Sequence, residues 1–176
     1  MTHSDDLGRV VVPKEIRRTL RIREGDPLEI FTDREGEIIL KKYSPIGELG
    51  IFAGQYAESI AQTMGCLVCI SDRDHIIAAA GNGRKDYDGK PISQQLESII
   101  EERSHHVSAK NDKSFVKITL DDRADYQTQA ISTIISEGDA IGAVILCSQE
   151  DKETSGAVQE KLVQTAAGFL GKQMEQ

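Results

Sequence analysis

The sequence predicts an α+β fold: a small β-rich N-terminal unit, followed by a larger unit in which helices flank an antiparallel sheet. Three observations support this prediction. Two short runs of alternating apolar residues within residues 28–41 are typical of a hairpin. Long helical patterns lie at 46–64 and 153–174. Short apolar, strand-like runs lie between these two patterns. We expect the two long helices to pack together beside the sheet.

The charge balance changes at Tyr43-Ser44-Pro45, which we interpret as a linker. Residues 1–45 hold nine basic and nine acidic side chains, whereas residues 46–176 hold twelve basic and twenty acidic ones. We therefore expect two domains, 1–45 and 46–176. The first is too short for a robust core of its own and has neither cysteine nor a metal-ligand cluster, so we expect it to need a partner chain.

In the N-terminal domain, the β-branched run at residues 8–12 predicts a strand that Pro13 ends. Proline at a first helical position favours a short helix, here over 14–20. Residues 28–32 and 37–41 alternate around an Asp-Arg-Glu-Gly turn and predict a hairpin. The expected order is therefore strand, helix, hairpin.

In the C-terminal domain, apolar or alternating runs predict strands. The expected strands are 67–71, 75–80, 114–120, 128–135 and 140–147. The first helix is expected to end at Gly65, and Ser93 is expected to cap a short helix that ends near Arg103. We expect His105 and His106 at the end of that helix or in a loop.

The glycine-rich segment 81–90 lacks the spacing and the lysine–hydroxyl pair of a phosphate loop. We expect a plain loop there, placed where it can cover a pocket.

Residues 9–23 concentrate positive charge on an acidic protein. They hold six basic side chains and one acidic one, a local charge of +5, while the whole chain carries −8. Such an island indicates a polyanionic partner, and arginine forks match phosphates and guanine edges. The family resemblance described below implies that this partner is double-stranded DNA. The candidate DNA-binding residues are Arg9, Arg17, Arg18, Arg21 and Arg23. The alternative is an ordinary solvated helix face.

The string GRVVVPKEIRRTL at residues 8–20, continued by GDPLEIF at 25–31 and EIILKKY at 37–43, resembles the AbrB-type DNA-binding domain. The resemblance implies a swapped-hairpin homodimer that binds DNA through basic residues on its exposed face. Arg9, Arg17 and Arg18 match the basic positions that such domains use.

Domains of this family begin with one more strand, which also carries basic residues, whereas only Met1-Thr2-His3-Ser4 precede Asp5 here. A missing strand leaves an unpaired sheet edge, and unpaired buried backbone groups cost about 1–3 kcal/mol each. The alternative function is therefore a ligand-sensing oligomerisation module that has lost DNA binding with that strand.

The order helix, two strands, helix, three strands, helix over 46–176 resembles a GAF-type sensory domain, most clearly in its GAVIL strand and long final helix. PAS-like and profilin-like domains share much of this order. The resemblance implies a pocket on one face of the sheet, and hence a possible small-molecule ligand.

The combination of an AbrB-type domain with a second domain of this size resembles bacterial transcription regulators of late, forespore-specific sporulation genes, which act as activators and repressors. An antitoxin role, as among small AbrB-like proteins, would instead require a disordered C-terminal peptide.

The sequence contains no catalytic serine, histidine or paired-carboxylate arrangement, so we expect neither an enzyme nor a metal site or cofactor. Cys66 and Cys69 lie three apart in a strand pattern and are expected to face opposite sides of the sheet. There is no run of 18 apolar residues and no signal peptide. We expect a soluble, cytoplasmic protein that does not bind membranes.

The final helix carries more apolar side chains than one narrow core stripe needs. They are Val158, Leu162, Val163, Ala166, Phe169 and Leu170. This excess predicts a helix–helix seam between chains, and with the N-terminal homodimer it predicts a homotetramer. The alternative is packing within the domain alone.

Overall fold

The computed structural model describes residues 7–123 and 125–175. The chain divides into two compact units, Met1–Tyr43 and Ser44–Gln176, which we call the N-terminal unit and the C-terminal unit. The division falls two residues before the boundary that the charge balance predicts.

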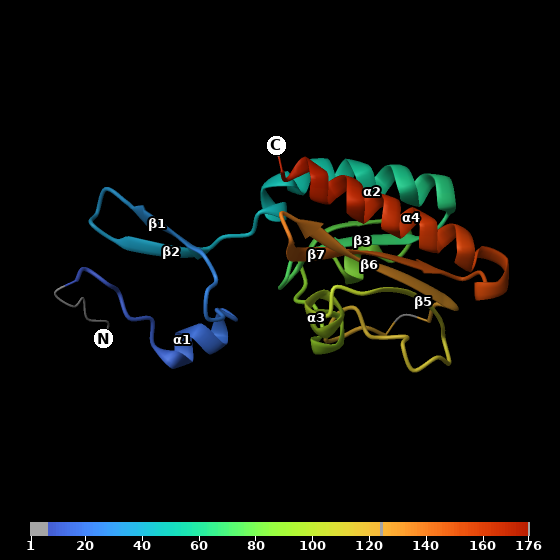
Figure 1. Ribbon diagram of the computed structural model, residues 1–176, viewed down its shortest axis with the longest axis horizontal. Coiled ribbons are helices and arrows are strands. Elements are labelled where there is room, and N and C mark those ends of the chain that lie inside the picture. Colours follow the sequence, from blue (N-terminus) through green and yellow to red (C-terminus); the bar gives the residue numbers. More distant parts are fainter. Residues whose placement is uncertain (1–6, 124, 176) are drawn as a thin grey trace. The chain divides into compact units, whose positions relative to one another are not determined.

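The N-terminal unit has the helix and the hairpin that the sequence predicts (Figure 1). Its elements are α1 (Lys14–Thr19), β1 (Leu28–Thr32) and β2 (Ile38–Lys42). Pro13 is the N-cap of α1, and its carbonyl accepts a hydrogen bond from the N–H of Arg17 at 3.0 Å. Asp33 shapes the β1–β2 turn, because its Oδ1 accepts the N–H groups of Glu35 and Glu37 at 3.0 and 2.8 Å.

The strand predicted over residues 8–12 is wrong for this structure, in which the segment forms no strand and only Val10 is part of an isolated bridge. A β-branched run becomes a strand only where a neighbour pairs with it, and here β1 and β2 pair with each other. The expectation of a missing first strand concerns residues 1–4, which lie outside the described residues.

None of the described residues 7–43 is buried. Both faces of the hairpin expose apolar side chains: Ile30 and Ile38 lie on one face, 63% and 64% exposed, and Phe31 and Ile39 lie on the other, 48% and 47% exposed. A hairpin with two apolar faces in water lacks the cover that makes a strand pair stable.

The C-terminal unit is built on an antiparallel sheet with strand order β4-β3-β7-β6-β5. Its strands are β3 (Leu67–Ser71), β4 (Ile76–Ala80), β5 (His105–Ala109), β6 (Thr128–Ser136) and β7 (Asp139–Ser148). Its helices are η1 (Ile46–Leu49), α2 (Gly50–Met64), η2 (Arg84–Asp86), α3 (Gln94–Glu101) and α4 (Lys152–Gln173). Among the helices of residues 7–123 and 125–175, none combines the length and the hydropathy that a membrane span requires.

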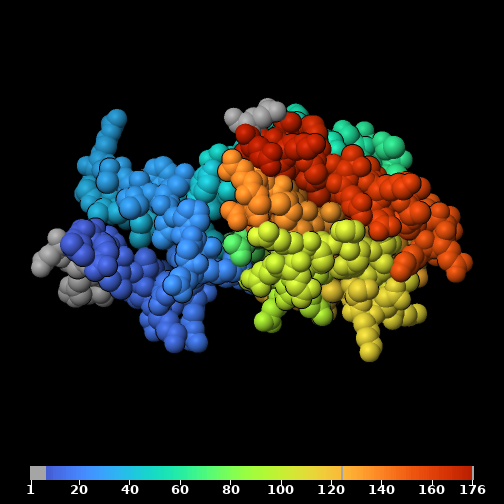
Figure 2. All heavy atoms as spheres, in the orientation of Figure 1, coloured from blue at the N-terminus to red at the C-terminus, as the bar shows by residue number. Residues whose placement is uncertain are grey.

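Helices α2 and α4 cover one face of this sheet and α3 covers the other (Figure 1). In the space-filling view, α4 (red) lies on one side of the sheet. The segment that begins with α3 and ends before β6 (yellow-green to yellow) lies on the opposite side (Figure 2). The strand residues alternate accordingly: Cys66 belongs to the apolar cluster under α2 and α4, and Cys69 to the cluster under α3. The prediction that these two thiols face opposite sides is confirmed.

The predicted strand at 114–120 is wrong, because the edge strand β5 lies earlier, at His105–Ala109, and pairs with β6. Side chains satisfy the backbone of the later segment instead of a ladder. The amide of Gln129 accepts the N–H of Val116 at 3.0 Å and donates to its carbonyl at 2.8 Å, and Gln95 accepts the N–H of Lys117 at 3.0 Å. The expectation that His105 and His106 lie at a helix end or in a loop is also wrong, because both residues belong to β5.

Candidate nucleic-acid interface

The five candidate arginines lie in and around α1, but they differ in exposure. Arg9, Arg17 and Arg18 are exposed, whereas Arg21 and Arg23 are half-buried. Neither Arg17 nor Arg18 makes an ion pair or a side-chain hydrogen bond with any residue in the described part of the chain. Their guanidinium groups are therefore available to an external anion.

The helix ends in a way that fixes the direction of the chain after Arg18. The N–H of Ile22 donates to the carbonyl of Arg17 at 2.8 Å, and the N–H of Arg21 donates to the carbonyl of Arg18 at 3.3 Å. These two hydrogen bonds form a Schellman motif, in which the residue with left-handed backbone conformation is usually glycine. Arg21 occupies that position with φ +51. A side chain there costs about 1–2 kcal/mol of backbone strain.

Lys42, on β2, holds this strained turn in place. Its Nζ donates to the carbonyl oxygen of Arg21 at 2.8 Å and lies 3.1 Å from Oδ2 of Asp26. The same carboxylate oxygen accepts the N–H of Arg23 at 2.8 Å. We call Asp26 and Lys42 the clamp, because together they tie the backbone of Arg21 and Arg23 to the hairpin.

The clamp is well shielded, since the Lys42 side chain is 20% exposed and the Asp26 side chain 7%. Burial alone raises the pKa of Asp26, but the hydrogen bond from Arg23 and the hydrogen bond and charge of Lys42 outweigh it. The pKa of Asp26 is therefore lowered from 3.8, and the carboxylate stays ionised at neutral pH.

The structure thus divides the candidate residues by what their surroundings allow. Exposed Arg17 and Arg18 share one short helix and can reach phosphates or base edges. Nη1 of Arg23 is shielded from solvent, so this residue is suited to shaping the loop rather than to reaching far from it. Nothing in the sequence indicates the clamp, because its two members lie sixteen positions apart and neither belongs to the basic segment 9–23.

Negative charge gathers at the β1–β2 turn. Exposed carboxylate oxygens of Asp33, Glu35 and Glu37 come within 4.8 Å of one another there. Asp33 already serves its own turn through Oδ1. All three residues are exposed, and such acidic groups repel phosphate, so DNA would contact the N-terminal unit away from this tip.

A second exposed surface lies on the helices of the C-terminal unit. Rings of Phe52 and Tyr56 on α2 and Phe169 on α4 have centroids 5.4–6.3 Å apart. Phe169 is 40% exposed, and Val158 on α4 and Ile51 on α2 are 57% and 84% exposed. We call this surface the aromatic seam. It includes two of the residues in the predicted seam of the final helix.

Two family models together match nearly the whole chain. Residues 48–175 match the model described as stage V sporulation protein T C-terminal, transcription factor. Residues 4–48 match the model described as antidote-toxin recognition MazE, bacterial antitoxin.

Two similar proteins come from Bacillus subtilis (strain 168). Stage V sporulation protein T is 52% identical over 172 residues, which are 98% of this chain and 94% of that protein. Transition state regulatory protein AbrB is 66% identical over 41 residues, 23% of this chain and 42% of that protein.

Among solved structures, the GAF domain of the A. aeolicus nlh2 protein in an inactive state superposes with a TM-score of 0.53 at 9% identity, over 73% of this chain and 91% of that one. This likeness concerns the fold, and it confirms the prediction of a GAF-like sheet flanked by helices.

Proposed function

This chain belongs to the stage V sporulation protein T family of transcription factors, and we propose that it regulates sporulation genes by binding double-stranded DNA through its N-terminal unit. The observation that carries the proposal is the pair Arg17 and Arg18. Both side chains are exposed, neither has an ion pair or hydrogen bond with a described residue, and both lie on a helix within a segment of charge +5. Arg9 and Arg21 would extend the contact, and Arg23 would support it. The genes would be late and forespore-specific, with the chain acting in the cytoplasm as activator and repressor.

The DNA-binding form we propose is a dimer, built by residues 1–45. Nine large apolar side chains of the described N-terminal residues are exposed in the single chain. They are Leu7, Val10, Val11, Ile16, Leu20, Ile30, Phe31, Ile38 and Ile39. A second hairpin would cover one apolar face of β1–β2, and a partner strand would pair with residues 8–12.

The aromatic seam would join two such dimers into a homotetramer. Its exposed apolar side chains lie on two neighbouring helices, which suits a helix–helix contact between chains. Two DNA-binding dimers in one assembly would gain affinity for paired sites through their high effective concentration. Replacing Val158 with glutamate, which puts a charge on that surface, should yield dimers in analytical ultracentrifugation, whereas Gln164→Glu, exposed on the same helix, should leave tetramers.

The alternative, a sensing module that has lost DNA binding, is not favoured. The 52% identity runs through almost the full length of both chains and includes the basic segment. The antitoxin role is not favoured either, because residues 48–175 match a transcription-factor model and form a folded unit. An enzymatic function is not favoured either, because the family model that matches residues 48–175 describes a transcription factor.

The test is binding to a fluorescein-labelled DNA duplex, followed by anisotropy over a range of salt concentrations. The parent chain should lose affinity steeply with salt, because each neutralised phosphate adds about 0.9 to the slope of log K against log salt. Arg17→Ala with Arg18→Ala should weaken binding roughly 100-fold and reduce that slope by roughly 2–4 in the dimer.

The matched control removes two positive charges from exposed positions of the C-terminal unit, Lys113→Ala with Lys117→Ala, and should leave both affinity and slope unchanged. Analytical ultracentrifugation of the arginine variant should show an intact oligomer. A variant that falls apart into monomers would make the cluster structural and contradict the proposal.

A further inference from the structure

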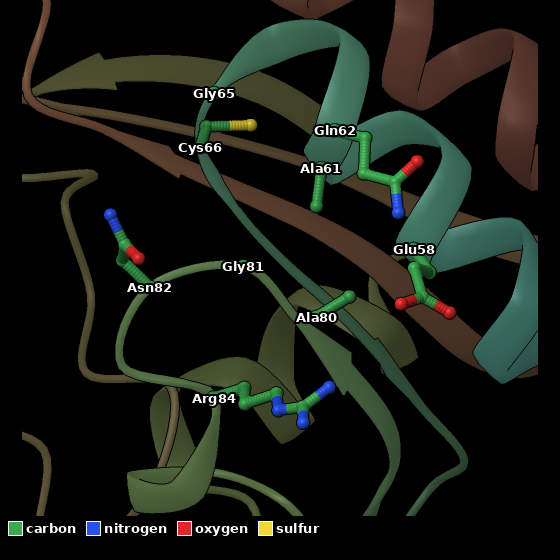
Figure 3. Close-up of a pocket in the computed structure, with 9 residues that line it drawn as sticks. All are labelled: Glu58, Ala61, Gln62, Gly65, Cys66, Ala80, Gly81, Asn82 and Arg84. Carbon is green, nitrogen blue, oxygen red and sulfur yellow. The ribbon is translucent and has the colours of Figure 1, made fainter.

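A hollow of about 240 Å³ lies in the C-terminal unit, between the last turns of α2 and the loop that follows β4 (Figure 3). Glu58 and Gln62 reach it from α2, and Arg84 reaches it from the loop. Ala61, Cys66 and Ala80 supply small apolar walls. It lies on the α2 side of the sheet, away from the α3 side, whose apolar cluster is filled by large side chains such as Tyr87.

The hollow holds one charge of each sign. The carboxylate of Glu58 and the guanidinium of Arg84 point into it from its two sides (Figure 3). Neither forms an ion pair or a side-chain hydrogen bond with any residue the structure describes, the other included. Two opposite charges that border one small space without pairing can each bind the complementary charge of a ligand.

The loop side of the hollow is held in a fixed position. Gly81 has φ +92, and a Cβ there would come within 2.2 Å of the Cys66 carbonyl oxygen, so only glycine allows this close approach. Tyr126 also holds this loop, because its hydroxyl donates a hydrogen bond to the carbonyl of Asn82 at 3.3 Å. A site whose backbone is already in place loses less conformational entropy when a ligand binds.

We propose that this hollow binds a free α-amino acid with a short aliphatic side chain. The Arg84 guanidinium would bind the ligand carboxylate with two parallel hydrogen bonds, and the Glu58 carboxylate would bind the ammonium group. Its volume is below the roughly 300–1,000 Å³ of sites for drug-sized ligands, so the ligand is small. The walls of Ala61 and Ala80 suit a side chain of a few carbons. A simple anion would meet Glu58, and a simple cation would meet Arg84, so neither fits both sides.

The test is isothermal titration calorimetry of the full-length, extensively dialysed protein with L-valine, L-alanine and L-leucine. Two analogues of L-valine each lack one charged group: isovalerate has no ammonium and isobutylamine has no carboxylate. We expect saturable binding of at least one amino acid with a Kd on the order of 0.1–1 mM, and binding of both analogues at least 10-fold weaker.

Variants locate the binding. Arg84→Gln and Glu58→Gln should each weaken the amino acid at least 10-fold, while Lys85→Gln, which removes a charge from the neighbouring loop position outside the hollow, should have no effect. Unfolding temperatures in the absence of ligand check that each variant is folded. No saturable binding of any of the three amino acids overturns the proposal, as does unchanged binding by Arg84→Gln. Isovalerate that binds as tightly as L-valine rules out a zwitterion site. DNA binding by the N-terminal unit is measured separately, and none of these outcomes bears on it.

Discussion

The two units of this chain carry apolar side chains at the same strand and helix spacings, but only the C-terminal unit buries them. Ile145 in the central strand β7 is 1% exposed, and Phe31 in the hairpin is 48% exposed. The C-terminal unit closes two apolar clusters with its own helices. The N-terminal unit has no buried residue among those described. The difference shows that the C-terminal unit completes its core within one chain, whereas the described residues of the N-terminal unit form no buried core of their own.

The largest effect is expected from truncating the core of the C-terminal unit. Ile145→Ala removes buried methylene and methyl groups and leaves a cavity, so it should lower the free energy of unfolding by about 2–5 kcal/mol. Urea denaturation followed by circular dichroism measures it. Because the core lies within one chain, the loss should persist when the protein is diluted until its oligomers separate; a loss that disappears on dilution would place this side chain at an interface.

A smaller effect is expected from Phe31→Ala, and it should depend on association. In a dimer the ring would be covered by the partner, so each chain should lose about 1–2 kcal/mol of unfolding free energy. In separated chains the ring is already half in water, and the variant should unfold like the parent. Circular dichroism melts at several protein concentrations measure both regimes, with exposed Thr32→Ala as the control on the same strand.

The clamp provides a third comparison, inside the N-terminal unit. Lys42→Met keeps the apolar stem but removes the hydrogen bond to Arg21 and the partner of Asp26, so it should cost about 1–2 kcal/mol of stability. It should also weaken DNA binding several-fold, because Arg21 and Arg23 lose their fixed backbone. Lys41→Met removes the same charge from the exposed neighbouring position and should change both quantities much less. Equal effects of the two variants would mean that only net charge matters.

The smallest effects are expected from the pH dependence of stability. The N-terminal unit should lose stability at acid pH and the C-terminal unit at alkaline pH. The pKa of Asp26 is lowered from 3.8 in the folded state, although burial opposes this, because Arg23 and Lys42 stabilise its charge. Its contribution to stability is therefore present above about pH 3.8 and is lost as pH falls through the lower folded value. In thermal melts from pH 5 to about pH 3, Asp26→Asn should reduce the pH dependence of the N-terminal unit's unfolding.

In the C-terminal unit, one group should make the stability fall as pH rises, which is the opposite direction to Asp26. Burial raises the pKa of the Cys66 thiol from 9.0 to about 11, so the unfolded chain ionises first as pH rises. The folded unit should lose stability between about pH 9 and pH 11, and Cys66→Ala should reduce that loss. An unchanged alkaline profile in this variant would show that the thiol does not contribute.

Much of the fold could be predicted because it depends on local pattern. The strands near 128–135 and 140–147, the helix that ends at Gly65 and the Ser93 cap are all as expected. The edge strand was missed because His105–Ala109 is largely polar, whereas 114–120 alternates as a strand does. Long-range side-chain bonds decided between them: Gln95 and Gln129 satisfy the later segment from elements that the sequence does not show to be neighbours.

The candidate site was predictable in composition but not in geometry. Charge density selects the segment that holds the five arginines, but it cannot separate exposed Arg17 and Arg18 from half-buried Arg21 and Arg23. The left-handed conformation of Arg21 had no sequence signal, because the residue there is not glycine. The carbonyl of Arg21 also accepts a hydrogen bond from Lys42, which lies twenty-one positions away in the sequence.

The uncovered N-terminal unit has a consequence for how much of this protein a cell must make. If its folding requires a second chain, the folded fraction rises with chain concentration rather than being fixed, as for any obligate dimer. Few chains would then leave most N-terminal units open to proteolysis, and the folded, DNA-competent fraction would increase more than in proportion to synthesis. The same exposed hairpin that completes the fold would thereby set an expression threshold below which the regulator is silent.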